Sequence, residues 1–199
     1  MSCTDFKLLK ERLEILKEKF LDSQLAIEGN DPLTFQSDFD QLAAFRLLFH
    51  AEVEGFLEAK AKENMDRISS SLTSPKWIRQ YPELLSLAFA LKKQAPHDEL
   101  DTTKFNNFVQ TLVSSANQSI KDNNGIKSPS FILLSICAGK TIDEIDSVLS
   151  GSLNSYGKDR GDVAHKSVTQ SRTINAPSTE LSAATSIVNQ IGNYFDIEA

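Results

Sequence analysis

Apolar residues recur every three or four positions along most of the chain, which is the spacing of one face of an α-helix. The first stripe, within residues 4–27, consists of Phe6, Leu9, Leu13, Leu16 and Phe20. Similar stripes predict further helices over residues 31–69, 83–94, 102–121, 128–139, 141–163 and 178–195. No segment alternates convincingly between apolar and polar residues, as a half-buried strand would. The pattern therefore predicts an all-α fold, a helical bundle of about six or seven helices.

Capping residues mark where several of these helices begin. Asp31 precedes Pro32, and a capping residue followed by proline is a frequent helix start. Thr141 and Glu144 have the spacing of a capping box, so we expect the next helix to begin there. Ser178 is the expected cap of the last helix.

Length and composition are those of an ordinary globular domain. The chain has 199 residues, of which 40% are hydrophobic and 24% are charged. A domain of this size buries enough surface to fold without disulfides or metals. We therefore expect one domain over residues 1–199, with its core in residues 30–197 and an N-terminal helix in residues 1–28.

Features of secretion and membrane insertion are absent from the sequence. The first five residues contain no apolar segment of a signal peptide. The longest apolar run, residues 131–137, is far shorter than the roughly 20 residues that a spanning helix needs. Cys3 and Cys137 are too far apart in the sequence to suggest a disulfide framework. We expect a cytoplasmic protein with no membrane contact.

The net charge of −6 restricts the ways in which this chain could bind nucleic acid. Proteins that bind nucleic acid over a wide surface are usually basic, because contacts to phosphates dominate the affinity. The chain either does not bind nucleic acid or binds it through a small, locally positive patch.

The most reactive combination of side chains lies in the segment from Arg160 to His165, Arg-Gly-Asp-Val-Ala-His. The planar guanidinium of Arg160 suits a phosphate or a carboxylate. His165 titrates near neutral pH, so it can accept and donate protons. Asp162, three residues before His165, could orient the imidazole. This Arg-x4-His combination indicates chemistry on a phosphodiester, with RNA as the leading candidate.

Two charged residues fall on apolar stripes, where core residues are expected. Arg160 continues the stripe of residues 145–163, and Glu52 lies in the phenylalanine-rich stripe of residues 42–56. A buried charge is unfavourable unless an opposite charge meets it. We therefore expect Glu52 to contact Arg160 or His165, either as a structural ion pair or as an active-site carboxylate.

His50 and Glu54 have the i, i+4 spacing of neighbours on a helix, and they could pair there. They lack a third ligand for a metal ion, and the glycines form no phosphate-binding loop. We expect no metal and no cofactor.

The Arg-x4-His segment on the penultimate long helix resembles the signature of HEPN domains, and the chain is similar to the RiboL-PSP-HEPN type. Three further features support the resemblance: the phenylalanine-rich acidic segment 49–56, an asparagine-rich turn before a Ser-Pro helix in residues 123–136, and a polar loop with a capped helix after the motif. The resemblance covers residues 35–197.

The resemblance implies a helical bundle that dimerises across the motif helices and cleaves single-stranded RNA without a metal ion. Such endoribonucleases act in toxin–antitoxin or phage-defence systems, so an antitoxin or another partner protein is a further expectation. The 2′-hydroxyl would attack the adjacent phosphorus while Arg160 stabilises the phosphoryl charge and His165 moves the proton. Lys158 and Lys166 would add positive charge to the RNA-binding groove of the expected homodimer.

One position departs from the family pattern. Members usually place Asn, Asp or His directly after the arginine, whereas this chain has Gly161, with Asp162 one position later. The alternative function is therefore a catalytically inactive HEPN-like helical module for protein interaction or nucleotide binding. In that alternative, Arg160 is an ion-pair anchor to Glu52.

Overall fold

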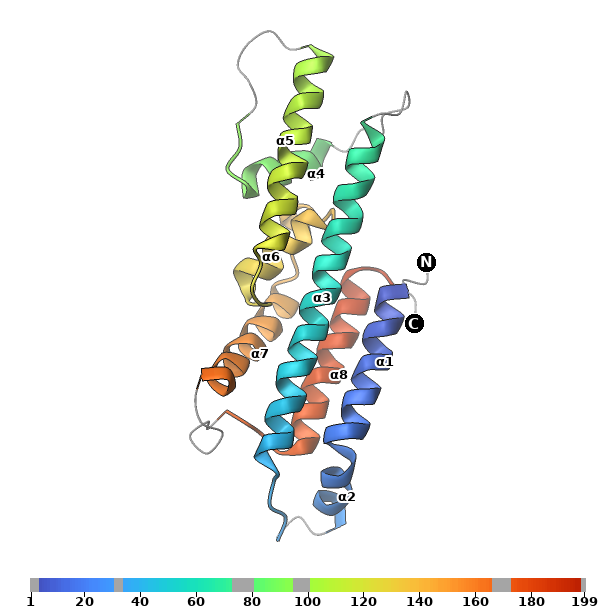
Figure 1. The fold of residues 1–199 in the computed structure, drawn as a ribbon, viewed down its shortest axis with the longest axis vertical. Helices are drawn as coiled ribbons and strands as arrows, with labels where there is room; N and C mark the ends of the chain where they lie inside the picture. The colour runs from blue at the N-terminus through green and yellow to red at the C-terminus, as the bar shows by residue number, and fades with distance from the viewer. Residues whose placement is uncertain (1–3, 31–33, 73–80, 95–100, 166–172, 198–199) are drawn as a thin grey trace. The chain divides into compact units, whose positions relative to one another are not determined.

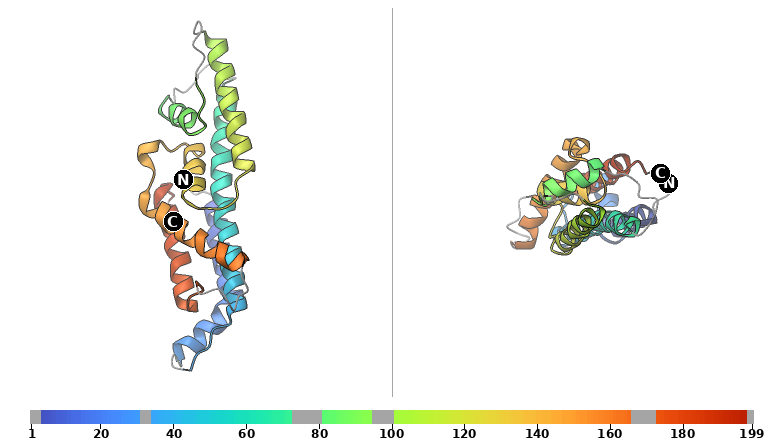
Figure 2. Two further views of the ribbon diagram at one scale, coloured as in Figure 1. Left: turned by 90° about the vertical axis from the view of Figure 1, so that its left-hand side faces the viewer. Right: turned by 90° about the horizontal axis from the view of Figure 1, so that it is seen from above.

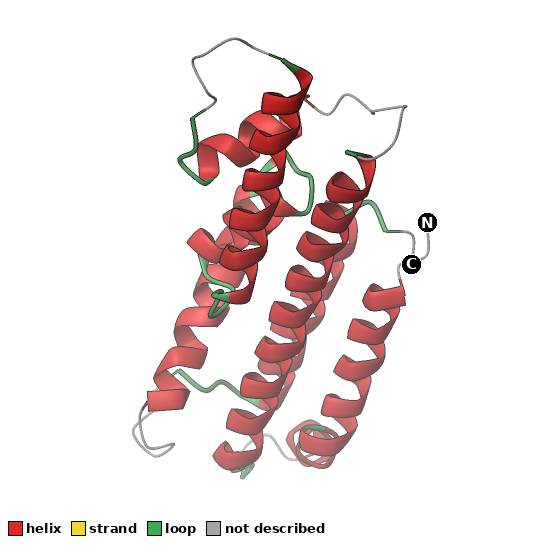
Figure 3. Ribbon diagram, turned by 45° about the horizontal axis from the view of Figure 1, so that its top comes forward, coloured by secondary structure: helices red, strands yellow, loops and turns green. Residues whose placement is uncertain are grey.

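The computed structural model describes residues 4–30, 34–72, 81–94, 101–165 and 173–197, apart from the side chains of Tyr81, Asp162, Ala164 and His165. These residues form helices joined by loops, with no strand among them, as Figure 3 shows. The predicted all-α class is confirmed. No helix in these ranges combines the length and the apolar character required to cross a membrane.

The elements in chain order are α1 (Thr4–Phe20), α2 (Asp22–Asn30), α3 (Phe39–Ser71), α4 (Tyr81–Ala90), α5 (Thr102–Lys121), α6 (Ser128–Cys137), the 3₁₀ turn η1 (Ile142–Glu144), α7 (Ser147–His165) and α8 (Pro177–Tyr194), labelled in Figure 1.

The chain divides into two compact units. The first unit consists of Met1–Phe56, Gly125–Ser128 and Asp146–Ala199, and the second consists of Leu57–Asn124 and Pro129–Ile145. Helix α3 contributes its first half to the first unit and its second half to the second. The single domain expected from the sequence stays a prediction.

The first unit is built around the apolar stripe of the first half of α3. In Figures 1 and 2, α1, α8 and this part of α3 run side by side, and α8 also contacts α2 and α7. Phe6 of α1 meets Phe56 of α3 edge-on, with ring centroids 5.9 Å apart. Phe49 of α3 meets Tyr156 of α7 in the same way at 5.5 Å. The predicted stripe of α3 is therefore the face on which α1 and α7 pack.

The second unit is held by side chains of the second half of α3. Asn64 donates through Nδ2 to the carbonyl oxygen of Cys137 at the end of α6, over 2.9 Å. Arg67 donates through Nη2 to Glu83 Oε2 of α4 over 3.1 Å. Helix α4 in turn contacts α5. None of the side chains expected to carry chemistry lies in this unit.

Two helices begin at positions that differ from those predicted. Helix α3 begins at Phe39, because the carboxylate of Asp38 accepts the backbone N–H groups of Asp40 and Gln41. The expected start at residues 31 and 32 lies outside the described residues. Helix α8 begins at Pro177, and the hydroxyl of Ser178 donates to Glu28 of α2 over 2.8 Å instead of capping α8.

The N-terminal stripe forms part of the core of the first unit. It is divided into α1 and α2 by a turn at Leu21, whose side chain is fully buried. The buried residues of α1 are Phe6, Leu9, Leu13 and Leu16, which are the residues of the predicted stripe apart from Phe20.

Leu16 and Leu8 test whether α1 unfolds together with the rest of the first unit. Leu16 is 2% exposed and Leu8 is 51% exposed. Leu16→Ala leaves a cavity and should lower the free energy of unfolding by about 2–5 kcal/mol. Leu8→Ala is the matched control and should change it by about 0.5 kcal/mol or less. Urea unfolding measures both; equally small effects would mean that α1 is not part of the cooperative core.

Candidate functional site

Helix α7 positions Arg160 at the edge of the core. Asp146 Oδ1 accepts the backbone N–H groups of Val148 and Leu149, and so fixes the start of the helix. One face of α7 is then buried, through Leu149, Leu153, Tyr156 and Val163. Arg160 lies on this face and is partly exposed. Its Nε is buried and has no hydrogen-bond partner among the described residues.

A short loop before α6 lies against both α3 and α7. Gly125 donates its backbone N–H to Glu54 Oε1 of α3. Gly125 has φ of +119°, and a Cβ built on it would lie 3.9 Å from His50 Nε2. A Cβ built on Gly157 of α7 would lie 3.1 Å from Lys127 Cγ. The two glycines therefore allow the loop to contact His50 on one side and α7 on the other.

These contacts bring four charged or titratable side chains from three segments together. We call this set the Arg160 cluster: Arg160 of α7, Lys127 of the loop, and His50 and Glu54 of α3. His50 is 2% exposed, and its Nδ1 lies 3.7 Å from Glu54 Oε2 without a hydrogen bond. The side chain of Lys127 is exposed.

His50 is the neutral member of the Arg160 cluster. Burial, together with the positive charges of Arg160 and Lys127, lowers the pKa of His50 to about 4. The effect of Arg160 on His50 means that the two side chains interact electrostatically. At neutral pH the cluster therefore presents two cations beside a neutral imidazole and one carboxylate, an arrangement that can hold an anionic group.

The structure describes the side chains of only some of the predicted site residues. The backbones of Asp162 and His165 belong to α7, but their side chains lie outside the described residues, as does the whole of Lys166. Lys158 is exposed on α7. The position of Arg160 on the core-facing side of α7 agrees with the sequence pattern.

Glu52 has a different partner from the Arg160 expected for it, and its expected contact with His165 stays a prediction because the side chain of His165 lies outside the described residues. Glu52 Oε1 accepts a hydrogen bond from Arg12 Nε of α1 over 2.8 Å, and it does not pair with Arg160. Both side chains are partly exposed, at 40% for Arg12 and 30% for Glu52. Helix α1 packs on α3 at this level, so the carboxylate meets a partner that the stripe of α3 alone could not reveal.

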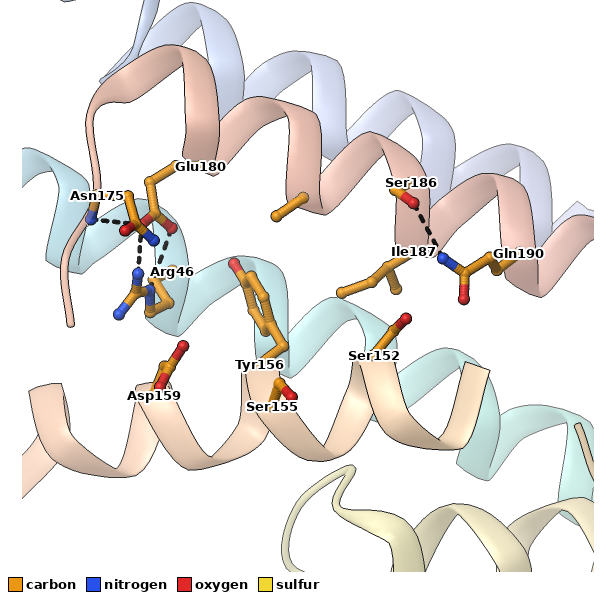
Figure 4. A pocket seen from close by; sticks show the side chains of 11 residues that line it. Arg46, Ser152, Ser155, Tyr156, Asp159, Asn175, Glu180, Ser186, Ile187 and Gln190 are labelled. Atoms are coloured by element: carbon orange, nitrogen blue, oxygen red, sulfur yellow. Dashed lines mark hydrogen bonds and ion pairs between the residues drawn. The ribbon is translucent and has the colours of Figure 1, made fainter. Parts of the chain in front are cut away.

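The sequence analysis also missed a buried ion pair between Arg46 of α3 and Glu180 of α8. The side chains are 2% and 1% exposed, and Arg46 Nε donates to Glu180 Oε2 over 3.1 Å. Arg46 Nη2 donates to the carbonyl oxygen of Thr173 over 2.7 Å, and Glu180 accepts the backbone N–H of Asn175 over 2.9 Å. Figure 4 shows this pair beside Tyr156. The sequence feature that could have revealed this ion pair is a charged residue next to the apolar stripe of each helix: Arg46 follows Phe45, and Glu180 precedes Leu181.

A pocket of about 230 Å³ lies between α7 and α8, next to this ion pair (Figure 4). Helix α7 contributes Ser152, Ser155, Tyr156 and Asp159 to its lining. Within the described part of the chain, no three His, Cys, Asp or Glu side chains are grouped so that they could hold a metal ion.

The buried histidine predicts a pH dependence of stability. The pKa of His50 is lower in the folded protein, about 4, than its ordinary value of 6.5, so the unfolded chain binds this proton first as the pH falls. The contribution of His50 to stability is therefore present above about pH 6.5 and is lost between pH 6.5 and 4. Wild type should lose roughly 3 kcal/mol more than His50→Gln between pH 7 and about pH 4. Urea unfolding at both pH values measures this difference, and parallel losses would contradict it.

Glu180 and Glu52 allow a matched comparison of a buried and a partly exposed carboxylate. Glu180→Gln leaves the charge of Arg46 buried without its counter-charge and should lower the free energy of unfolding by about 3–5 kcal/mol. Glu52→Gln removes a partly exposed pair and should lower it by about 1 kcal/mol or less. Denaturant midpoints of the two variants check this order. A larger effect of Glu52→Gln would restore the idea that Glu52 is an anchor of the core.

Comparison of the chain with protein-family models, with curated proteins and with solved structures found no match.

Proposed function

We propose that this protein is an endoribonuclease that cleaves RNA without a metal ion and uses Arg160 to bind the reacting phosphate. The observation that carries the proposal is the buried Nε of Arg160, which has no hydrogen-bond partner within the described residues. An unsatisfied buried donor is unfavourable, and more so on a charged group. A phosphate oxygen would satisfy this donor, and the planar guanidinium is suited to phosphate geometry.

The surroundings of Arg160 favour an anionic ligand. Lys127 adds a second positive charge from the loop, and its side chain is accessible to solvent. His50 stays neutral above its lowered pKa of about 4, so it does not add to the repulsion between the cations. The local positive charge is compatible with the overall charge of −6, because only a small patch would contact RNA.

In the proposed reaction, the 2′-hydroxyl of RNA attacks the adjacent phosphorus and the 5′-oxygen of the next nucleotide leaves. Arg160 stabilises the negative charge that develops on the phosphoryl oxygens. His165 transfers a proton, Asp162 orients its imidazole, and Lys158 and Lys166 bind neighbouring phosphates. The homodimer expected from the sequence would supply a second histidine, so that one acts as base and the other as acid.

The proposal predicts which side chains RNA cleavage depends on. Incubated with single-stranded RNA in EDTA, wild type should cleave, and Arg160→Ala should be slower by about 10²–10³-fold. His165→Ala should also lose activity. Arg12→Ala is the matched control, because Arg12 pairs with Glu52 and lies outside the Arg160 cluster; it should cleave like wild type. Gel analysis of the products gives the rates.

Two results would contradict the proposal. Cleavage that requires a divalent ion would exclude the metal-free mechanism. Failure of the folded wild-type protein to cleave a panel of RNA homopolymers and mixed sequences would favour the inactive helical module instead.

A further inference from the structure

The pocket between α7 and α8 contains two polar atoms without protein partners. Tyr156 is 6% exposed, and its Oη is buried without a hydrogen bond among the described residues. Gln190 Oε1 of α8 is buried and unpartnered in the same sense, while its Nε2 donates to Ser186 Oγ over 2.9 Å. Figure 4 shows Tyr156 directed from α7 towards α8, and the oxygen of Gln190 directed towards α7. Two such groups in one pocket call for an explanation.

The chemistry of these two atoms is complementary. Burial raises the pKa of Tyr156 well above its ordinary value, and the charge of Glu180 raises it further, so the hydroxyl stays protonated and can donate. The oxygen of Gln190 can only accept. A ligand that fills the pocket and satisfies both atoms must therefore carry an acceptor and a donor.

The walls of the pocket restrict the ligand further. Ile187 and Ala183 of α8 give it an apolar side, and the hydroxyls of Ser152 and Ser186 give it a polar side. At about 230 Å³ it is smaller than the roughly 300–1,000 Å³ of pockets that hold drug-sized ligands. A flat ring with apolar faces and hydrogen-bonding groups at opposite ends of its rim matches both the size and the lining. Nucleobases have this form.

We propose that this pocket is a nucleobase-binding subsite, in which Tyr156 Oη donates to one end of the base and Gln190 Oε1 accepts from its opposite end, as the positions of the two side chains at the two ends of the pocket in Figure 4 require. As a part of the RNA site, this inference rests on the proposed function. Tyr156 and Arg160 are four residues apart on α7, which is a rise of about 6 Å along the helix. A nucleotide whose phosphate binds Arg160 therefore has its base within reach of the pocket, and the pocket would select the base beside the cleaved bond.

The test separates base binding from RNA cleavage. Adenosine, guanosine, cytidine and uridine are titrated into the full chain and followed by NMR, with D-ribose as the probe of sugar binding. At least one nucleoside should bind more tightly than ribose. Tyr156→Phe removes only the hydroxyl and should weaken that binding about three- to tenfold. Tyr194→Phe is the matched control, a tyrosine with 8% exposure that does not line the pocket, and it should bind like wild type.

RNA cleavage provides the second readout. Tyr156→Phe should change the relative rates at the four bases, whereas Tyr194→Phe should not. If wild type cleaves RNA but binds no nucleoside better than ribose, the subsite is overturned and the proposed function stands. If a nucleoside binds and this depends on Tyr156, but no RNA is cleaved, the nucleobase pocket is supported and the proposed function fails. Equal effects of the two tyrosine variants on nucleoside binding would overturn the role of Tyr156.

Discussion

The buried ion pair between Arg46 and Glu180 is the interaction on which the first unit most depends. It connects the first half of α3 to the start of α8, and Thr173 and Asn175 supply further hydrogen bonds to the two charges. Both groups are almost completely removed from water. Neither can lose its partner without leaving an uncompensated charge in the interior. The pair therefore holds the first half of α3 against the start of α8, next to the pocket that Arg46, Glu180 and Tyr156 line together.

The helices of this protein could be predicted from sequence because their apolar faces are regular. The stripe of α7 is an example, since Leu149, Leu153 and Tyr156 are all buried as expected. Helix boundaries were harder, because two capping signals can lie close together. The capping box of Thr141 and Glu144 is present, yet it starts only the 3₁₀ turn η1. The extended backbone of Ile145 ends that turn, and Asp146 caps the helix that follows.

The candidate site was only partly visible in the sequence, because its members come from distant segments. Arg160 could be found from its charge on an apolar face. Its neighbours His50 and Lys127 could not, since only the packing of α3, the loop and α7 brings them together. Glu52 illustrates the reverse case. Its charge was noticed, but its pairing with Arg12 was not foreseen, because the position of α1 over α3 is a tertiary property.

The loop that carries Lys127 can lie close to α7 because residue 157 is a glycine and has no Cβ. A Cβ at position 157 would lie 3.1 Å from the aliphatic stem of Lys127, so the loop lies where it does because α7 presents bare backbone there. The same loop is hydrogen-bonded to Glu54 at Gly125. The position of the loop that carries Lys127 thus depends on the backbone shape of α7 at Gly157. A larger residue at position 157 would displace this loop from α7, and would so alter the surroundings of Arg160 without replacing any ionisable group.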